Sequence, residues 1–204
     1  MIKFLMTLPI FLFAVMIHEI AHGWVAHRLG DNTAKVQGRL SLNPIVHIDP
    51  TGTILLPLLL YIIGSPVIFG WAKPVPVNFL NIRRPKMGMV LVSLAGITAN
   101  FLLAIFLSVL VRSGIFPENS QGHLFLNIGI LINLILAVFN AVPIPPLDGF
   151  NMLVGLLPRK FGYPLSRLQP YGFVILFALM YIGLLGKLVW PIVILLYYAL
   201  AGSA

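Results

Sequence analysis

Two histidines one helix turn apart, with a glutamate directly after the first, are the residues of this chain best suited to chemistry. They are His18, Glu19 and His22, in the stretch His-Glu-Ile-Ala-His. Residues i and i+4 of a helix lie on the same face, so both imidazoles can reach a single metal ion. Glu19 then stands beside the first ligand, where it can handle the proton of a metal-activated water. The spacing predicts a metal site with hydrolytic chemistry.

These ionisable residues follow an almost wholly apolar run, residues 4–17, which leads straight into them. An ionisable side chain in hydrocarbon costs at least about 2–3 kcal/mol, and membrane proteins keep such a residue mainly where it has a function. Polar groups in lipid also lack water as a hydrogen-bonding partner. The surroundings therefore favour metal binding over a chance match. The alternative is a buried polar network that holds no metal.

The composition indicates a polytopic helical membrane protein. Of its 204 residues, 59% are hydrophobic and 9% are charged, and the mean hydropathy is +1.01, whereas soluble domains carry about 25% charged residues. We expect a single domain over residues 1–204, with a core over 1–157 and C-terminal helices over 168–202. The absence of cysteine excludes disulfides, thiolate ligands and a cysteine nucleophile.

The first apolar segment has a lysine before it, as a signal peptide does. We expect it to be retained, because it carries the candidate ligands and no small-residue cleavage site follows the run. The net charge of +8 comes from basic residues that lie singly or in pairs between apolar segments. That pattern is typical of membrane topology signals, and we expect no nucleic-acid partner.

Five segments are predicted to span the membrane, which takes about 20 apolar residues each. They cover residues 2–29, 87–111, 122–142, 171–185 and 190–201. Residues 51–70 are apolar but interrupted by Pro57 and by a Gly-Ser-Pro turn signal, which predicts either a broken spanning helix or a re-entrant hairpin. Residues 36–42 alternate like a short strand. The predicted fold class is all-α, with one strand-like segment.

The candidate third ligand follows the segment 122–142. Residues 140–150 contain Pro143, Pro145 and Pro146, which cannot continue a helix. Irregular backbone at membrane depth is tolerated where it is buried in protein or lines a wet cavity, so we expect a site here. Asp148 is the other carboxylate near hydrocarbon, and it would complete three protein ligands of a catalytic zinc. The remaining histidines and acids are weaker candidates: His27, His47, His123, Asp31, Asp49 and Glu118.

The histidines and Asp148 share a membrane face only if segments 2–29 and 122–142 run in the same direction, which requires residues 51–70 to re-enter. In that arrangement ten basic residues share one face: Arg28, Lys35, Arg39, Lys73, Arg83, Arg84, Lys86, Arg159, Lys160 and Arg167. The other face holds three: Lys3, Arg112 and Lys187. A spanning segment 51–70 would divide them eight to five. Since Lys and Arg gather on the cytoplasmic side, we expect the hairpin, with the metal near that side.

Two motifs resemble the signatures of the site-2 protease family of intramembrane zinc metalloproteases. They are the His-Glu-Ile-Ala-His stretch and Asn140-x-x-Pro143-x-x-Pro146-Leu147-Asp148-Gly149. Residues 95–100 look like the small-residue motif of the family, with Ile97 where proline is frequent. The resemblance covers about residues 1–157, and we expect the minimal branch without a PDZ or CBS domain. It implies that His18, His22 and Asp148 bind one Zn²⁺ and that Glu19 is the catalytic acid and base.

The resemblance also implies an endopeptidase that hydrolyses peptide bonds within or near transmembrane segments, in regulated intramembrane proteolysis. Asn140 or Asn100 would donate a hydrogen bond to the oxyanion, or would instead hold helices together. The expected partners are a membrane-protein substrate and the lipid bilayer, in the plasma membrane of a prokaryote. The sequence indicates neither the substrate-binding residues nor the oligomeric state. The alternatives are a non-proteolytic zinc-binding membrane protein and a metal transporter.

Overall fold

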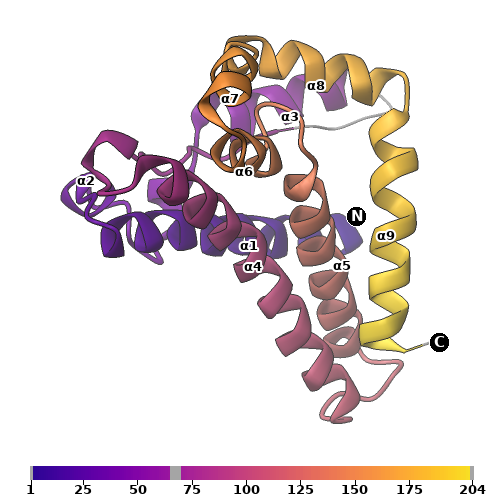
Figure 1. Ribbon diagram of the computed structural model, residues 1–204. Helices are drawn as coiled ribbons and strands as arrows, with labels where there is room; N and C mark the ends of the chain where they lie inside the picture. Colours follow the sequence, from indigo (N-terminus) through magenta and orange to yellow (C-terminus); the bar gives the residue numbers. More distant parts are fainter. Residues whose placement is uncertain (1, 65–69, 203–204) are drawn as a thin grey trace.

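The computed structural model describes residues 2–64 and 70–202, and within these ranges the chain is helical, with no β-strand. Four of the helices are long and apolar enough to cross a membrane. They are α1 (Ile2–Arg28), α4 (Pro85–Arg112), α5 (Gln121–Ala141) and α9 (Leu184–Ala201), as Figure 1 shows. Large apolar side chains such as Phe106 and Leu195 are exposed on them, which is typical of helices surrounded by lipid. The all-α polytopic membrane fold predicted from the sequence is confirmed.

Helix α1 packs antiparallel against α4. His22, near the C-terminus of α1, contacts the carbonyl oxygen of Val92 in the first half of α4. Two turns earlier in α1, the carbonyl oxygen of Ala14 accepts a hydrogen bond from Asn100, two turns later in α4. The short connection 113–120 returns the chain along α4 as α5. Helices α1 and α5 cross at a wide angle in Figure 1, but both run opposite to α4, as the predicted topology requires.

Arg112 joins two helices at one end of the bundle. Its guanidinium group donates to the carbonyl oxygens of Ala199 and Leu200, at 2.8 and 2.7 Å, where α9 ends. The opposite end holds the C-termini of α1 and α5 and the N-termini of α4 and α9, and we call it the site end. The buried apolar core between α4, α5, α8 and α9 includes Ala104, Ile130, Leu134, Leu176, Val189 and Val193.

Short helical elements gather toward the site end (Figure 1). The α-helices are α2 (Thr33–Val36), α3 (Leu56–Ile62), α6 (Asp148–Leu156), α7 (Arg159–Ser166) and α8 (Gly172–Tyr181). The 3₁₀ turns are η1 (Pro44–His47), η3 (Phe79–Asn81) and η4 (Gln169–Tyr171), and η2 (Pro50–Leu55) is a π-helical turn. The side chains of Asn43, Asp49 and Asn78 accept backbone N–H bonds where η1, η2 and η3 begin. These caps satisfy donors that short turns leave unpaired.

The segment between α2 and α4 contains a closed hairpin. The N–H of Trp71 donates to the carbonyl oxygen of Gly52 at 3.1 Å, and the hydroxyl of Thr53 donates to the carbonyl oxygen of Trp71 at 2.8 Å. The indole lies so close that a Cβ atom on Gly52 would stand 2.3 Å from it, so this position requires glycine. Part of the predicted turn, residues 65–69, lies outside the described residues. The chain nevertheless leaves and returns at one point, and α3 has only seven residues, which favours the hairpin over the spanning helix.

The strand predicted over residues 36–42 is wrong. Val36 ends α2, and the following residues form turns and bends. Gly38 has φ +66°, in the left-handed region, which interrupts an extended backbone. The chain turns there so that Arg39 points inward, where its guanidinium group binds the backbone of residues 73 and 74. Tertiary hydrogen bonds thus override the alternating pattern.

The fourth predicted span, residues 171–185, is also wrong. Helix α8 covers only ten residues of it, which is about 15 Å of helix and half a bilayer core. The chain then turns at Gly183, which has φ +73°, and α9 begins directly afterwards. Because α8 does not cross, Lys187 lies toward the site end with the ten basic residues of the larger group, and not with Lys3 and Arg112.

Candidate metal centre

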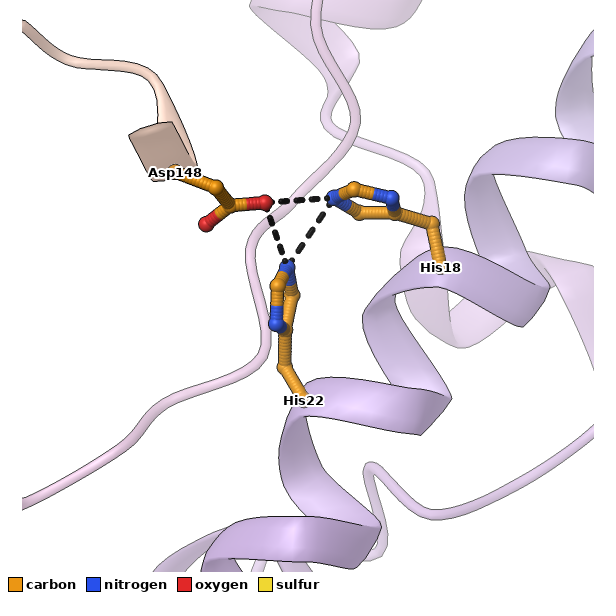
Figure 2. Close-up of side chains that lie close together, drawn as sticks. All are labelled: His18, His22 and Asp148. Carbon is orange, nitrogen blue, oxygen red and sulfur yellow. Dashed lines mark hydrogen bonds and ion pairs between the residues drawn. The ribbon is translucent and has the colours of Figure 1, made fainter. Parts of the chain in front are cut away.

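The three candidate ligands meet at one point, as Figure 2 shows. His18 and His22 project from neighbouring turns of α1, and Asp148 is the first residue of α6. Each histidine Nε2 lies 3.1 Å from Oδ2 of Asp148, and the two Nε2 atoms are 2.9 Å apart. Both imidazoles are buried. The structure thus brings together the residues that the sequence predicted as ligands, from segments far apart in the chain.

Hydrogen bonds on the far side of each ring orient the two imidazoles. Nδ1 of His18 lies 2.6 Å from Oδ1 of Asn100, and Nδ1 of His22 lies 2.7 Å from the carbonyl oxygen of Val92. Both partners are oxygens that only accept, so each Nδ1 carries the proton and donates it. Each Nε2 then presents a lone pair toward Asp148. This is the arrangement that metal-binding histidines adopt in proteins.

Asn100 is itself held by a second buried amide. Its Nδ2 donates to the carbonyl oxygen of Ala14 at 3.1 Å and to Oδ1 of Asn133 at 2.9 Å. Asn133 in turn donates to the carbonyl oxygen of Gly129, one turn earlier in α5. Both amide protons of Asn100 are therefore used, so the geometry favours a positioning role over the oxyanion role. This role of Asn133 was not predicted, although an asparagine within the apolar segment 122–142 is a visible signal.

The backbone after α5 places Asp148. The chain folds back so tightly that a Cβ on Gly149 would lie 2.2 Å from the carbonyl oxygen of Ala141, so only glycine fits there. A carboxyl group of ordinary pKa is ionised at neutral pH, which is the form that binds a metal.

The donor set fits a zinc ion. Two imidazole nitrogens and one carboxylate oxygen, with a position left for water, make up the usual catalytic zinc site. Three lone-pair atoms about 3 Å apart also need a cation between them, and Oδ2 of Asp148 is buried without a hydrogen-bond donor of good geometry. Gly96 of α4 leaves room for the rings, because a Cβ there would lie 2.6 Å from Cε1 of His18 and 2.5 Å from Cε1 of His22.

Glu19 is half-buried beside this group. Its Oε2 accepts a hydrogen bond of 2.7 Å from the N–H of Val75. Val75 belongs to residues 71–78, a connection without helix or strand that we call the strap. The strap packs against α1, since a Cβ on Gly23 would lie 2.8 Å from the side chain of Val75. This contact is not predictable from the sequence, because it joins residues from separate segments.

Asn140 and the weaker candidates have other contacts. Nδ2 of Asn140 donates to the carbonyl oxygen of Leu136, one turn earlier in α5, at 3.0 Å. His27 pairs with Asn32, and His47 with the carbonyl oxygen of Ser41. Elsewhere in residues 2–64 and 70–202, no other group of histidine and acidic side chains is arranged to hold a metal.

Comparison with known proteins supports the same chemistry. The family model described as peptidase family M50 matches residues 118–183, a stretch that includes Asp148. The Bacillus subtilis protein YwhC is 41% identical over 181 residues, which cover 85% of this chain and 79% of YwhC. This chain belongs to peptidase family M50. The resemblance to the site-2 proteases drawn from the two motifs is thereby confirmed at the level of the family.

Other relatives of this M50 chain are more distant. Rip2 of Mycolicibacterium smegmatis is 29% identical over 180 residues, which cover 87% of this chain and 67% of Rip2. A Methanocaldococcus jannaschii protein is 28% identical over 150 residues, 74% of this chain and 34% of its own length. These relatives and YwhC carry the words zinc metalloprotease in their names. No solved structure matches the chain significantly.

Proposed function

We propose that this M50 chain is a zinc-dependent intramembrane endopeptidase that binds one Zn²⁺ through His18, His22 and Asp148. The observation that carries the proposal is the convergence of both Nε2 atoms and Oδ2 on one buried point. Glu19 stands next to that point on the same helix. The helices that supply and surround these residues are long and apolar enough to span a bilayer, so the scissile bond would be met at membrane depth.

Glu19 has the role of general base and then general acid. Zinc at this site supplies a Lewis acid that polarises the scissile carbonyl and lowers the pKa of water to about 7. Oε2 of Glu19 is held by Val75, so Oε1 is the oxygen that we expect to take the proton of the attacking water. Glu19 then gives this proton to the leaving amide nitrogen.

Asn140 is the candidate donor to the oxyanion. A side-chain amide has two N–H donors, and the structure uses one of them on Leu136. The second is available for a negatively charged oxygen that develops during attack, a contact typically worth about 3 kcal/mol. Asn140→Ala should therefore lower kcat about a hundredfold and leave the bound zinc unchanged, whereas a structural amide would instead affect thermal stability.

The proposed substrate is a transmembrane segment of another membrane protein, cleaved in regulated intramembrane proteolysis. The basic residues support a cytoplasmic site end in a prokaryotic plasma membrane, because with Lys187 eleven of the thirteen Lys and Arg lie there. A peptide carbonyl within a helix is already hydrogen-bonded, so the substrate must unwind locally before the bond is exposed.

The test is cleavage of a model transmembrane substrate in detergent by wild type and Glu19→Gln, with bound zinc counted in both. We expect Glu19→Gln to keep its zinc and to lose at least a hundredfold in rate. Glu118→Gln, which removes an exposed carboxylate between α4 and α5, is the matched control and should behave as wild type. Absence of zinc from well-folded wild type would contradict the proposal, as would full activity in Glu19→Gln.

A further inference from the structure

Arg39 is a buried cation with an unusual set of partners. It is 6% exposed, and its Nη2 donates to the carbonyl oxygens of Lys73 and Pro74, at 2.7 and 3.2 Å. Nε is buried without any hydrogen-bond partner. Among the described residues, no carboxylate lies within ion-pair distance of the guanidinium group. Burying a guanidinium group without a carboxylate partner and with one unsatisfied N–H destabilises the fold. Ordinary packing therefore does not explain why an arginine stands here.

The explanation lies in the peptide group between Pro74 and Val75. Its carbonyl oxygen accepts from Arg39, and its N–H donates to Oε2 of Glu19. The two ends of one peptide dipole therefore face a cation and a carboxylate. A cation at the oxygen polarises the peptide and strengthens the hydrogen bond that its N–H makes, since hydrogen bonds in a chain reinforce one another.

The sequence of the strap suits this arrangement. Pro74 and Pro76 have no N–H, so the N–H of Val75 is the one backbone donor of residues 74–76. Residues before proline are restricted to extended backbone, which limits how the peptide can rotate. The strap is also held at both ends, by Lys73 N–H on the carbonyl oxygen of His47 and by Asn78 N–H on Oδ2 of Asp31.

We propose that Arg39 is a positioning residue for Glu19, acting through the Pro74–Val75 peptide without touching the carboxylate. The guanidinium group fixes the orientation of this peptide, and the N–H of Val75 fixes Oε2, which leaves Oε1 as the oxygen for proton transfer. The inference rests on the proposed function, because it assigns Glu19 the proton transfer. The competing explanation is that Arg39 only ties residues 38–40 to the strap.

A double-mutant cycle separates the two explanations. Arg39→Gln removes the cation, and Val75→Pro removes the N–H that reaches Glu19. Val75→Ala loses similar packing but keeps the N–H, and it is the control. We expect Arg39→Gln and Val75→Pro each to lower kcat about 10–100-fold, with KM within twofold and zinc content unchanged, which is the usual effect of losing a supporting hydrogen bond. Arg39→Lys should recover part of the loss.

Non-additivity is the decisive result. If Arg39 acts through the N–H of Val75, Arg39→Gln in the Val75→Pro background should lower kcat less than threefold further. The proposal would be overturned if Arg39→Gln lowered kcat equally in the wild-type and Val75→Pro backgrounds. It would also be overturned if Val75→Ala lowered kcat as much as Val75→Pro does. Wild-type kcat in Arg39→Gln would overturn it as well.

Residue-resolved hydrogen exchange of the whole zinc-loaded protein gives a readout that needs no cleavage. Arg39→Gln should speed exchange of the Val75 amide at least tenfold and leave the Asn78 amide, bonded to Asp31, unchanged. If Arg39→Gln only loosened the strap, exchange of the Val75 and Asn78 amides would both become faster. If Arg39 had no influence, neither exchange rate would change. Either result contradicts the proposal. Because exchange is independent of catalysis, a wild type that cleaves nothing would count against the proposed function alone.

Discussion

The side chain of Asn100 in α4 accepts the Nδ1 proton of His18 in α1 at 2.6 Å. A residue from the middle of a membrane-length helix thus decides which ring nitrogen of His18 faces the metal position. The contact is buried, and a second asparagine on α5 secures it. Three helices are therefore joined by one chain of amides that ends at the metal centre, and zinc affinity should depend on all of them.

Asn100→Ala tests this dependence. Without the acceptor, the imidazole of His18 can rotate or shift its proton to Nε2, where the proton blocks metal binding. We expect zinc affinity to fall about 10–100-fold, as competition with a chelator of known affinity would measure. Asn127→Ala is the matched control, because Asn127 of α5 lies away from His18 and contacts His123 in the same helix and Tyr197 in α9. Equal affinity in Asn100→Ala and wild type would contradict the positioning role.

Gly96→Ala should close the space that the histidine rings occupy. The added Cβ would lie 2.5 to 2.6 Å from atoms of His18 and His22, so the rings must move from their positions around the metal. We expect zinc affinity to fall at least tenfold. The stability of α4 should not fall, since alanine stabilises a helix interior by about 1 kcal/mol over glycine. Gly186→Ala in α9 meets no atom within 4 Å and serves as the comparison.

Asp31 should make the fold sensitive to acid. Burial raises its pKa, but hydrogen bonds from Thr33, Asn81 and Asn78 outweigh burial and lower it below the ordinary value of 3.8. A lowered pKa gives stability that is present above the unfolded value and is lost as pH falls through the folded value. Asp31→Asn should cost about 2 kcal/mol at pH 7.

The measurement for Asp31 is thermal unfolding of wild type and Asp31→Asn in detergent from pH 7 to pH 3. The difference in Tm should be constant down to about pH 4 and should shrink below it. A difference that does not change with pH would show that the carboxylate is not held in its ionised form. Measuring the difference between the two proteins cancels the contribution of other titrating groups.

Removal of zinc should lower the stability of the protein. The metal binds the folded chain, whose three donors converge, and binds the unfolded chain weakly. At a free zinc concentration one hundred times Kd, the stabilisation is about 2.7 kcal/mol. Chelation should lower Tm reversibly, and zinc should restore it in a concentration-dependent manner. Asp148→Asn should abolish this response, whereas an unchanged Tm in wild type would argue against a bound metal.

The convergence of the three candidate ligands is predictable from the sequence because the information is local. The spacing of His18 and His22 depends on helix geometry alone, and Asp148 follows from prolines that end a helix beside an apolar segment. The hairpin is predicted from the number of Lys and Arg residues that each topology places on either face of the membrane. None of these inferences needs the packing of one helix against another.

What the sequence does not predict depends on long-range contacts. The bond from Val75 to Glu19 and the bond from Asn100 to Asn133 join segments whose approach is decided by tertiary packing. Residues 36–42 alternate like a strand, yet the buried bonds of Arg39 to the strap prevail over that local preference. The early end of α8 rests on a positive φ at Gly183, a torsion that apolar composition does not reveal.

The contact between Gly52 and Trp71 makes the residues between them a side loop with a closed base. An insertion inside such a loop leaves the ends where they were, and each doubling of loop length costs only about 0.6 kcal/mol in closure entropy. Changes in the loop therefore need not reach α1 or the metal position. A protein engineer could therefore vary the length of this apolar loop without moving its ends, whereas a charged insertion would oppose its placement in the membrane.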